Sequence, residues 1–316
     1  MSTRSGATIT GWGTALPPTV VTNADYEARL DTTDEWIRER TGIHERRHGS
    51  STAELATEAG RAALAMAGLT GADIDYLLLA TTTPDYQVPA TAAEVQERLG
   101  IAGGASDLNA ACSGFVYGLV HAHGLISMGL RRVLLIGAET LSLITDQEDR
   151  NTAILFADGA GAVVLEASDE DQLVAFDMGN DGTAVELLGA PIGGYLSMNG
   201  KEVFRRAVTV MVDSARRSMT DAGLTPDDIA LVVPHQANIR IIDAAMGRLD
   251  IPMERAAVVL HRTGNTSSAS IPLALADALA AGRVHRGDHV LLVGFGAGMS
   301  WASAIIRWNG HLEGSR

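Results

Sequence analysis

The sequence predicts an α/β protein built from two similar halves. Helical spacing of apolar residues alternates with short strands rich in β-branched residues. Two segment pairs also repeat in the same order: AGLTGADIDYLLLA (67–80) matches AGLTPDDIALVVPH (222–235), and RVLLIGAETLS (132–142) matches HVLLVGFGAGMS (289–300). A glycine helix ending explains the shared Ala-Gly-Leu-Thr, but neither the strand after it nor the second pair. The offsets of 155 and 157 positions therefore indicate a duplication, with halves expected at 1–170 and 171–316.

The predicted elements follow the same order in each half. In the first half we expect helices over 52–67 and 116–128, and strands over 76–81, 133–137 and 162–165, the last after a turn at Gly159 and Gly161. In the second half we expect helices over 203–222 and 271–281, and strands over 230–233, 290–293 and 302–306. This alternation predicts mostly parallel sheets with helices on both faces. No Pro- or Ser-rich linker separates the halves, so we expect one body with its site where they meet.

Composition and charge narrow the class of protein. With 316 residues and 46% hydrophobic residues the chain can bury a large core. A net charge of −14 argues against general nucleic-acid binding, and an acidic partner would need a local basic patch. The single cysteine excludes an internal disulfide, the start MSTRSGATITGWG lacks the apolar core of a signal peptide, and no apolar run reaches about 18 residues. We therefore expect a soluble, cytoplasmic protein.

Cys112 is the first candidate for chemistry. It lies in SDLNAACSGF (106–115), between a short strand and a predicted helix, and its small neighbours leave room for a substrate. A thiol at a helix N-terminus feels the positive end of the helix dipole, which favours the thiolate. Because a lone intracellular cysteine is more often an inert apolar residue, this interpretation needs support from other residues.

His235 and Asn265 are candidate partners from the second half. His235 directly follows the strand in VVPHQAN (232–238), and the carboxyl ends of strands collect catalytic groups in α/β folds. Asn265 lies in the polar loop HRTGNTSSAS (261–270), which the duplication aligns with the Cys112 turn. Taken alone, a histidine at a strand end is often a satisfied surface residue and a loop asparagine is often a turn former.

A glycine-rich segment near the C-terminus, GFGAGMSW (294–301), could direct backbone amides at a ligand oxygen. It is not a dinucleotide fingerprint, because no helix follows it. The GAGA at 159–162 fails for a similar reason, since a strand follows. The nine histidines are scattered and the sequence holds neither HExxH nor a phosphate loop, so we expect no metal site.

Together these motifs resemble β-ketoacyl-acyl carrier protein synthase III, a family of thiolase-fold condensing enzymes. The resemblance covers essentially the whole chain, and the order of the motifs is highly specific. In chain order the matching motifs are TNADYE (22–27), DTTDEWIRERTGI (31–43), AACSGF (110–115), ILFADGAGAVVL (154–165), VPHQANIRII (233–242), GNTSSASIP (264–272) and GFGAGMSW (294–301).

The resemblance implies a thiolase-like fold of two duplicated halves in five αβαβα layers, and a homodimer. It implies decarboxylative condensation of an acyl-CoA primer with malonyl-acyl carrier protein, at the start of fatty-acid or polyketide synthesis and with no cofactor. The primer's acyl group would be held on Cys112, while His235 and Asn265 would bind the enolate oxygen. The oxyanion would be held by the amide of Cys112 and an amide of the oxyanion loop, which comprises Gly296, Ala297 and Gly298.

The resemblance also implies two binding surfaces. Coenzyme A would be bound by Trp36 and Arg150 around the adenine, and by Arg40, Phe204 and Asn238 along the pantetheine. An acidic carrier protein would dock on a basic patch made of Arg240, Arg205, Arg206 and Arg248. Without the resemblance, the tryptophan would be interpreted as a partly buried helix residue and the arginines as a solvated face.

Three departures from the family pattern concern the primer. Val88 stands where many members carry a phenylalanine that closes the acyl pocket, and His44 replaces an arginine at the coenzyme A entrance. The segment 189–200 is several residues shorter than usual and would flank the entrance of the acyl pocket, as Val88 would. We therefore expect a primer that is longer or more branched than acetyl-CoA.

Other functions fit the same residues less well. A secondary-metabolism enzyme of this fold could move an acyl group to another nucleophile without condensation. A cysteine hydrolase would use the same Cys, His, Asn order, but its local signature is missing and the duplication has no place in that fold. Thiolases need a second cysteine, plant-type polyketide synthases have longer chains, and a silent carrier-binding subunit would be expected to lose Cys112 or His235.

Overall fold

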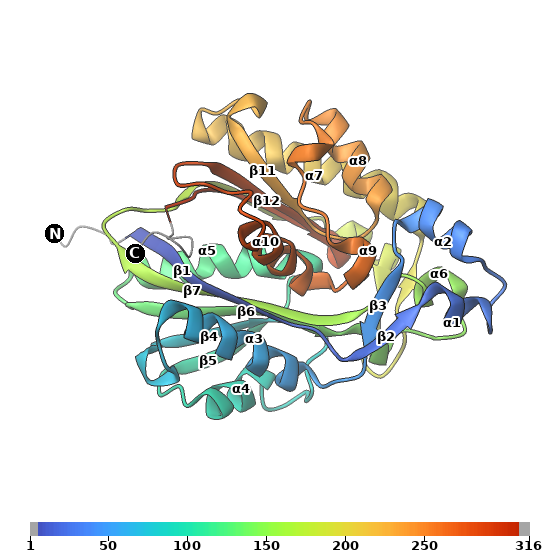
Figure 1. The fold of residues 1–316 in the computed structure, drawn as a ribbon, viewed down its shortest axis with the longest axis horizontal. Coiled ribbons are helices and arrows are strands. Elements are labelled where there is room, and N and C mark those ends of the chain that lie inside the picture. The colour runs from blue at the N-terminus through green and yellow to red at the C-terminus, as the bar shows by residue number, and fades with distance from the viewer. Residues whose placement is uncertain (1–5, 310–316) are drawn as a thin grey trace.

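The computed structural model describes residues 6–309, so the outermost residues of the two expected halves, 1–5 and 310–316, lie outside it. Two sheets alternate with three layers of helices (Figure 1). From bottom to top in that view, the helix layers are α3 (Thr52–Ala67) with α4 (Thr91–Leu99), α5 (Gly114–Ser127) with α10 (Ser270–Ala280), and α7 (Gly200–Ala222) with α8 (Ile239–Arg248). The predicted α/β fold with five αβαβα layers is confirmed.

The two sheets repeat one strand pattern. The first has the order β1 (Gly6–Ala15), β7 (Asp158–Ser168), β6 (Arg132–Thr140), β4 (Tyr76–Ala80), β5 (Gly104–Leu108). The second has the order β8 (Leu173–Asn180), β13 (Ser300–Arg307), β12 (His289–Gly296), β11 (Ile229–Pro234). In each sheet the first three strands are antiparallel and the remaining neighbours are parallel. The second sheet therefore repeats the strand pattern of the first sheet but lacks a counterpart of β5.

Every helix and strand predicted from the sequence is present, but two details of the prediction are wrong. The sheets are mixed rather than mostly parallel, because β12 and β13 are joined by three residues, far too few for a parallel crossover. The expected turn at Gly159 and Gly161 is absent, since both glycines lie inside β7. Helix α10 crosses this strand so closely that a Cβ on Gly161 would lie 2.8 Å from the Cβ of Pro272.

The central helices α5 and α10 are buried between the two sheets. Most residues of both helices are buried and apolar, and the exposed positions lie toward their C-terminal ends, at His121, Gly124 and Ser127 of α5 and at Asp277 and Ala280 of α10. Each helix begins directly after a 3-10 turn: η2 (Ala111–Ser113) precedes α5, and η7 (Ser267–Ala269) precedes α10. The two turns contact each other, so the starts of both helices meet in the middle of the molecule.

Smaller elements surround this frame. One group, at the right of Figure 1, comprises β2 (Thr19–Thr22), α1 (Asn23–Glu27), α2 (Asp34–Thr41), β3 (Glu45–His48) and α6 (Arg150–Ala153). A hairpin of β9 (Leu188–Gly189) and β10 (Ser197–Met198) precedes α7, and α9 (Leu260–Thr263) precedes η7. The remaining 3-10 turns are η1 (Gly71–Asp73), η3 (Leu141–Ile144), η4 (Gly182–Leu187), η5 (Pro226–Asp228), η6 (Met253–Arg255) and η8 (Ala297–Met299).

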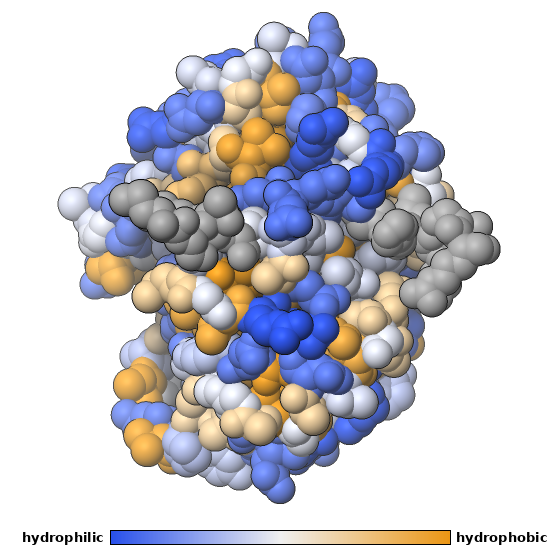
Figure 2. Space-filling model, turned by 90° about the vertical axis from the view of Figure 1, so that its left-hand side faces the viewer, coloured by the Kyte–Doolittle hydropathy of each residue, from blue (hydrophilic) through white to orange (hydrophobic). Residues whose placement is uncertain are grey.

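The chain passes from the first sheet to the second between Ser168 and Leu173. A domain division at about residue 170 would fall in this connection and stays a prediction. Figure 2 shows the end of the molecule that faces left in Figure 1, where hydrophilic residues are mixed with smaller groups of hydrophobic ones. Across residues 6–309, none of the helices combines the length and the apolar character needed to cross a membrane.

Candidate active site

Cys112 lines a cavity of about 490 Å³ between the two halves of the chain. The residue lies in η2, directly before α5, and is 9% exposed. Both halves contribute to the walls, which are mainly apolar. Among the lining residues are Tyr117, Leu141, Ile144, Phe156, Val185, Leu188, Ala190, Leu196, Ser267, Ala297 and Gly298.

The Cys112 thiol is protonated at neutral pH. Burial raises its pKa to about 12; the nearby charge of Glu139 acts in the same direction, and a hydrogen bond with the Ser267 side chain acts against both. The loss of water around the sulfur thus favours the thiol and opposes the expectation that the start of α5 favours a thiolate.

His235 lies at the end of β11 and is 1% exposed. Its backbone N–H donates to the carbonyl of Val293 at 2.8 Å, which continues the pairing of β11 with β12. Its ring Nδ1 lies 2.7 Å from the Ser270 hydroxyl, and the ring meets Phe295 edge-on with centroids 5.4 Å apart. Burial lowers the pKa of His235 to about 3, so the imidazole is neutral at neutral pH.

Asn265 is buried and lies just before the turn η7. Its backbone is fixed on both sides, since its N–H donates to Leu155 and its carbonyl accepts from Ala157, each at 2.9 Å. Its side-chain oxygen accepts from the N–H of Ser267 at 2.9 Å, and within residues 6–309 its amide N–H groups have no hydrogen-bond partner, so they are the free end. The segment 265–270 thus contains Asn265, contacts Cys112 through Ser267 and contacts His235 through Ser270.

The oxyanion loop lies against the Cys112 turn. A Cβ on Gly296 would lie 2.5 Å from the Cys112 nitrogen, so only glycine permits this approach. Gly298 has φ 127°, in the region that favours glycine. Ala297 and Gly298 line the cavity, whereas Gly296 lies behind them against the amide of Cys112.

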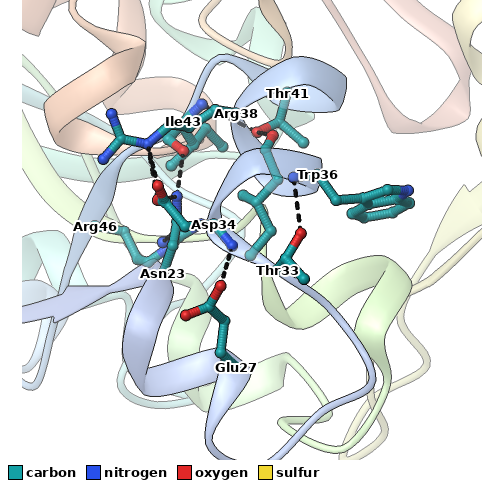
Figure 3. A network of polar contacts seen from close by, with 10 residues as sticks. Asn23, Glu27, Thr33, Asp34, Trp36, Arg38, Thr41, Ile43 and Arg46 are labelled. Atoms are coloured by element: carbon teal, nitrogen blue, oxygen red, sulfur yellow. Dashed lines mark hydrogen bonds and ion pairs between the residues drawn. The ribbon is translucent and has the colours of Figure 1, made fainter.

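The predicted coenzyme A residues form two neighbouring groups. Trp36 projects from α2 away from the core (Figure 3), and the guanidinium carbons of Arg150 and Arg40 lie 5.0 and 5.9 Å from its ring centroid. Phe204 is stacked in the same way by Arg240 at 5.7 Å. The side chain of Asn238 donates to the backbone carbonyl of Arg40 at 2.9 Å and so connects α8 with the end of α2.

A buried polar network holds α2 from behind (Figure 3). Arg46 has no exposed surface and donates to the Asn23 side-chain oxygen at 2.6 Å and to the carbonyl of Ile154, at the end of α6. Asn23 in turn donates to Asp34 at 2.7 Å and to the carbonyl of Ile43 at 2.9 Å. The helices that carry Trp36 and Arg150 are therefore joined through one guanidinium.

The arginines of the predicted basic patch differ in their partners. Arg205 forms an ion pair with Glu202 at 2.8 Å, and Arg206 with Asp181 at 3.0 Å. Arg240 and Arg248 lie exposed at opposite ends of α8, and neither forms an ion pair within residues 6–309. The arginines of the patch that have no ion-pair partner within residues 6–309, Arg240 and Arg248, therefore both lie on α8.

The residues that depart from the family pattern lie in different places. Val88 is 84% exposed and is not among the residues that line the cavity. In the shortened segment, Gly189, Ala190 and Leu196 line the cavity, as expected for a flank of the entrance. His44 is exposed and packs against His261 with ring centroids 6.0 Å apart.

Sequence reasoning missed three residues that complete the site: Ser267, Ser270 and Glu139. Glu139 is fully buried at the end of β6, and its carboxylate accepts from hydroxyl and amide groups of residues 81–83 and from Ser268. A carboxylate inside an apolar strand and three serines within 267–270 were visible signals. Among the described residues there is no group of three or more His, Cys, Asp or Glu side chains that could hold a metal ion.

Comparisons with known proteins find relatives that match nearly the whole chain. Family models described as 3-oxoacyl-[acyl-carrier-protein] synthase III and its C-terminal part match residues 106–182 and 219–308. A β-ketoacyl-[acyl-carrier-protein] synthase III of Roseiflexus sp. (strain RS-1) is 49% identical, covering 96% of this chain and 98% of the relative. The crystal structure of 3-oxoacyl-[acyl-carrier-protein] synthase III from Aquifex aeolicus VF5 has a TM-score of 0.94 at 44% identity, covering 96% of this chain and all of the other. The priming β-ketosynthase of the R1128 polyketide pathway has a TM-score of 0.93 at 36% identity, covering 98% of both chains.

Proposed function

Because the chain belongs to the 3-oxoacyl-[acyl-carrier-protein] synthase III family of condensing enzymes, we propose that Cys112 carries the primer's acyl group and that His235 and Asn265 serve the condensation. The observation that carries this assignment is the segment 265–270, which contains Asn265, lines the cavity beside Cys112 with Ser267, and hydrogen-bonds to His235 through Ser270. One short segment thus brings Asn265 and the partner of His235 to the wall of the apolar cavity that Cys112 lines.

In the first step, the Cys112 sulfur attacks the thioester carbonyl of an acyl-CoA. The oxyanion is held by the amide of Cys112 and an amide of the oxyanion loop, whose Gly296 lies against that nitrogen. The carbon–sulfur bond to coenzyme A then breaks, and coenzyme A leaves as a thiol with the proton that Cys112 gives up. The products are acyl-Cys112 and free coenzyme A.

In the second step, malonyl-acyl carrier protein loses carbon dioxide. The electron pair of the broken carbon–carbon bond becomes an enolate, whose oxygen accepts hydrogen bonds from His235 and from the free amide of Asn265. A neutral imidazole suits this task, because it donates a hydrogen bond without giving up its proton. The enolate carbon attacks acyl-Cys112, the carbon–sulfur bond breaks, and the Cys112 thiolate takes up one proton.

We also propose the binding surfaces by analogy with the family. Trp36 and Arg150 would stack on the adenine of coenzyme A, a geometry suited to a planar guanidinium, with Arg40, Phe204 and Asn238 along the pantetheine. The acidic carrier would dock at Arg240 and Arg248, where α8 offers unpaired positive charge, beside Arg205. A cytoplasmic homodimer that needs no cofactor completes the proposal.

Intact-protein mass spectrometry tests the first step. After incubation with a panel of acyl-CoA thioesters, the protein should gain the mass of one acyl group, and C112A should gain none. Carbon dioxide release from radiolabelled malonyl-acyl carrier protein tests the second step, and H235A and N265A should each lose about 100-fold or more. Acyl-Cys112 without carbon dioxide release would instead support acyl transfer to another nucleophile.

A polyketide carrier is the second candidate acceptor. The priming β-ketosynthase of the R1128 pathway shares this fold at a TM-score of 0.93, and the chemistry is the same for either carrier. Side-by-side kinetics with malonyl groups on a fatty-acid carrier and on a polyketide carrier decide between them. A kcat/KM at least tenfold higher for one carrier would assign the pathway.

A further inference from the structure

Ser270 is a partner of His235 that the reaction steps above do not use. It is the first residue of α10, has no exposed surface, and places its Oγ 2.7 Å from Nδ1 of His235. The same oxygen accepts a hydrogen bond from the backbone N–H of Gln236 at 3.3 Å. The hydroxyl therefore lies between one fixed donor and one nitrogen of the imidazole.

A neutral imidazole carries its hydrogen on either Nδ1 or Nε2. If Nδ1 carried it, Ser270 would receive hydrogens from both Nδ1 and Gln236, and its own buried hydroxyl hydrogen would need another acceptor. Within residues 6–309 the Ser270 hydroxyl has no other hydrogen-bond partner. If Nε2 carries the hydrogen, Ser270 donates to Nδ1 and accepts from Gln236, so both Nδ1 and the buried hydroxyl are satisfied and this tautomer is favoured.

The backbone N–H of Gln236, which donates to Ser270 and so favours the Nε2–H tautomer of His235, is held in place by its own side chain. The Gln236 side chain is fully buried, and its nitrogen donates to the carbonyls of Pro234 at 2.7 Å and Ala257 at 3.0 Å. Its oxygen accepts from the backbone N–H groups of Val259 and Leu260 at 3.0 and 3.2 Å. All four hydrogen-bonding sites of the amide are used, so the backbone at His235 and Gln236 cannot easily turn its N–H away from Ser270.

We propose that Ser270 is a positioning residue that keeps His235 as the Nε2–H tautomer, so that the imidazole donates a hydrogen bond at the reacting oxygen. Naming that oxygen as the enolate rests on the proposed function, whereas the tautomer is a property of the free protein. Ser270 acts through His235 and needs no contact with substrate. This role gives a reason for the hydroxyl at the buried start of α10, where alanine would fill nearly the same volume.

Nitrogen-15 NMR of protein labelled at histidine tests the tautomer directly, with H235Q used to assign the His235 signals. The wild-type ring should show a protonated Nε2 and a bare Nδ1 at pH 7. In S270A the signals should shift toward a mixture of tautomers, and S270T, which keeps the hydroxyl, should restore the wild-type pattern. S214A is the matched control, because it also removes a buried hydroxyl, 2.8 Å from that of Ser303 and remote from His235 in α7.

Kinetics provide the second readout. Carbon dioxide release should fall about 10- to 100-fold in S270A while acylation of Cys112 stays within about twofold of wild type, and S214A should change neither. If S270A does not fold, S270C fills the same space with a weaker donor and serves the same measurements. A wild-type ring protonated at Nδ1, or an S270A ring unchanged from wild type, would overturn the proposal. Absence of carbon dioxide release in wild type with the tautomer as expected would overturn the proposed function instead.

Discussion

Ala111 and Ser267 adopt the same left-handed backbone conformation, with φ of 48° and 47°. Each is the first residue of a 3-10 turn that leads into one of the two central helices. A non-glycine residue in this region costs about 1–2 kcal/mol, so matching strain lies on both sides of the site. One turn carries Cys112, and the other carries Ser267, which lines the same cavity.

The strain at Ala111 predicts an unusual response to glycine. In A111G the relief of strain and the greater freedom of the unfolded chain, about 0.5–1 kcal/mol, nearly cancel. We expect the free energy of unfolding in urea to change by less than about 1 kcal/mol, while acylation of Cys112 slows because its turn is less restricted. A122G, inside α5, is the control and should lose at least about 1 kcal/mol. Equal destabilisation of the two variants would contradict the strain argument.

The buried thiol predicts a steep dependence of alkylation on pH. Only the thiolate reacts with iodoacetamide, and burial raises the pKa of Cys112 to about 12. The alkylation rate should therefore rise about tenfold for each pH unit from 7 to 10, whereas an unstructured cysteine peptide levels off near pH 9. The rate is measured by intact mass spectrometry. A plateau for the protein below pH 9 would show that the helix dipole outweighs burial.

The buried imidazole predicts a loss of stability in acid. The folded pKa of His235, about 3, lies below the unfolded value of about 6.5, so the unfolded state binds the extra proton between these values. Stability contributed by the neutral ring is present above pH 6.5 and is lost toward pH 3, by about 1.4 kcal/mol per pH unit. Urea unfolding of wild type and H235Q from pH 7 to 5 isolates this slope from that of the carboxyl groups. Identical slopes would contradict it.

The helices and strands of this protein were easier to predict from the sequence than the contacts between them. The longest helices and the inner strands were predictable from apolar spacing, but helices α4 and α8 and strands β1 and β8 were missed. In β1, glycines at 11 and 13 interrupt the strand pattern because α3 crosses so closely that a Cβ would lie 2.3 and 2.4 Å from the carbonyls of Ala63 and Ala59. Such a requirement depends on a neighbour that sequence spacing does not reveal.

The site shows the same limit. Cys112, His235 and Asn265 could be selected because the duplication and the ordered motifs identify them one by one. Ser267 and Ser270 were visible as members of a serine-rich turn, but their roles were not, because these depend on which side chain faces them once two distant turns meet. The effect of burial on the pKa of Cys112 was not predictable for the same reason, since burial is a property of the assembled halves and not of its turn.

Arg46 offers a test of the network behind α2. R46M removes both hydrogen bonds and leaves Asn23 and the Ile154 carbonyl without their donor, so we expect a loss of about 1.5–3 kcal/mol in urea unfolding. Because Arg46 joins α2 to α6, the KM for acyl-CoA should rise at least about threefold with kcat nearly unchanged. R38M, which breaks only an exposed ion pair with Asp34, is the control and should cost less than about 1 kcal/mol. A similar cost for both variants would argue against a special role for Arg46.

The apolar walls of the cavity predict the choice of primer. Each methylene buried there contributes about 0.8 kcal/mol, or about fourfold in rate, so isobutyryl- and octanoyl-CoA should acylate Cys112 at least as fast as acetyl-CoA. Val88 is exposed and does not line the cavity of this chain, so we expect it to approach an acyl group across the contact between two chains. In a homodimer, V88F should shift the preference toward acetyl-CoA, and V20F, at another exposed valine, should not. Intact mass spectrometry with equal mixtures of the three primers measures this. A strong acetyl preference in wild type would refute the expectation of a longer or branched primer, and an unchanged preference in V88F would place Val88 outside the pocket.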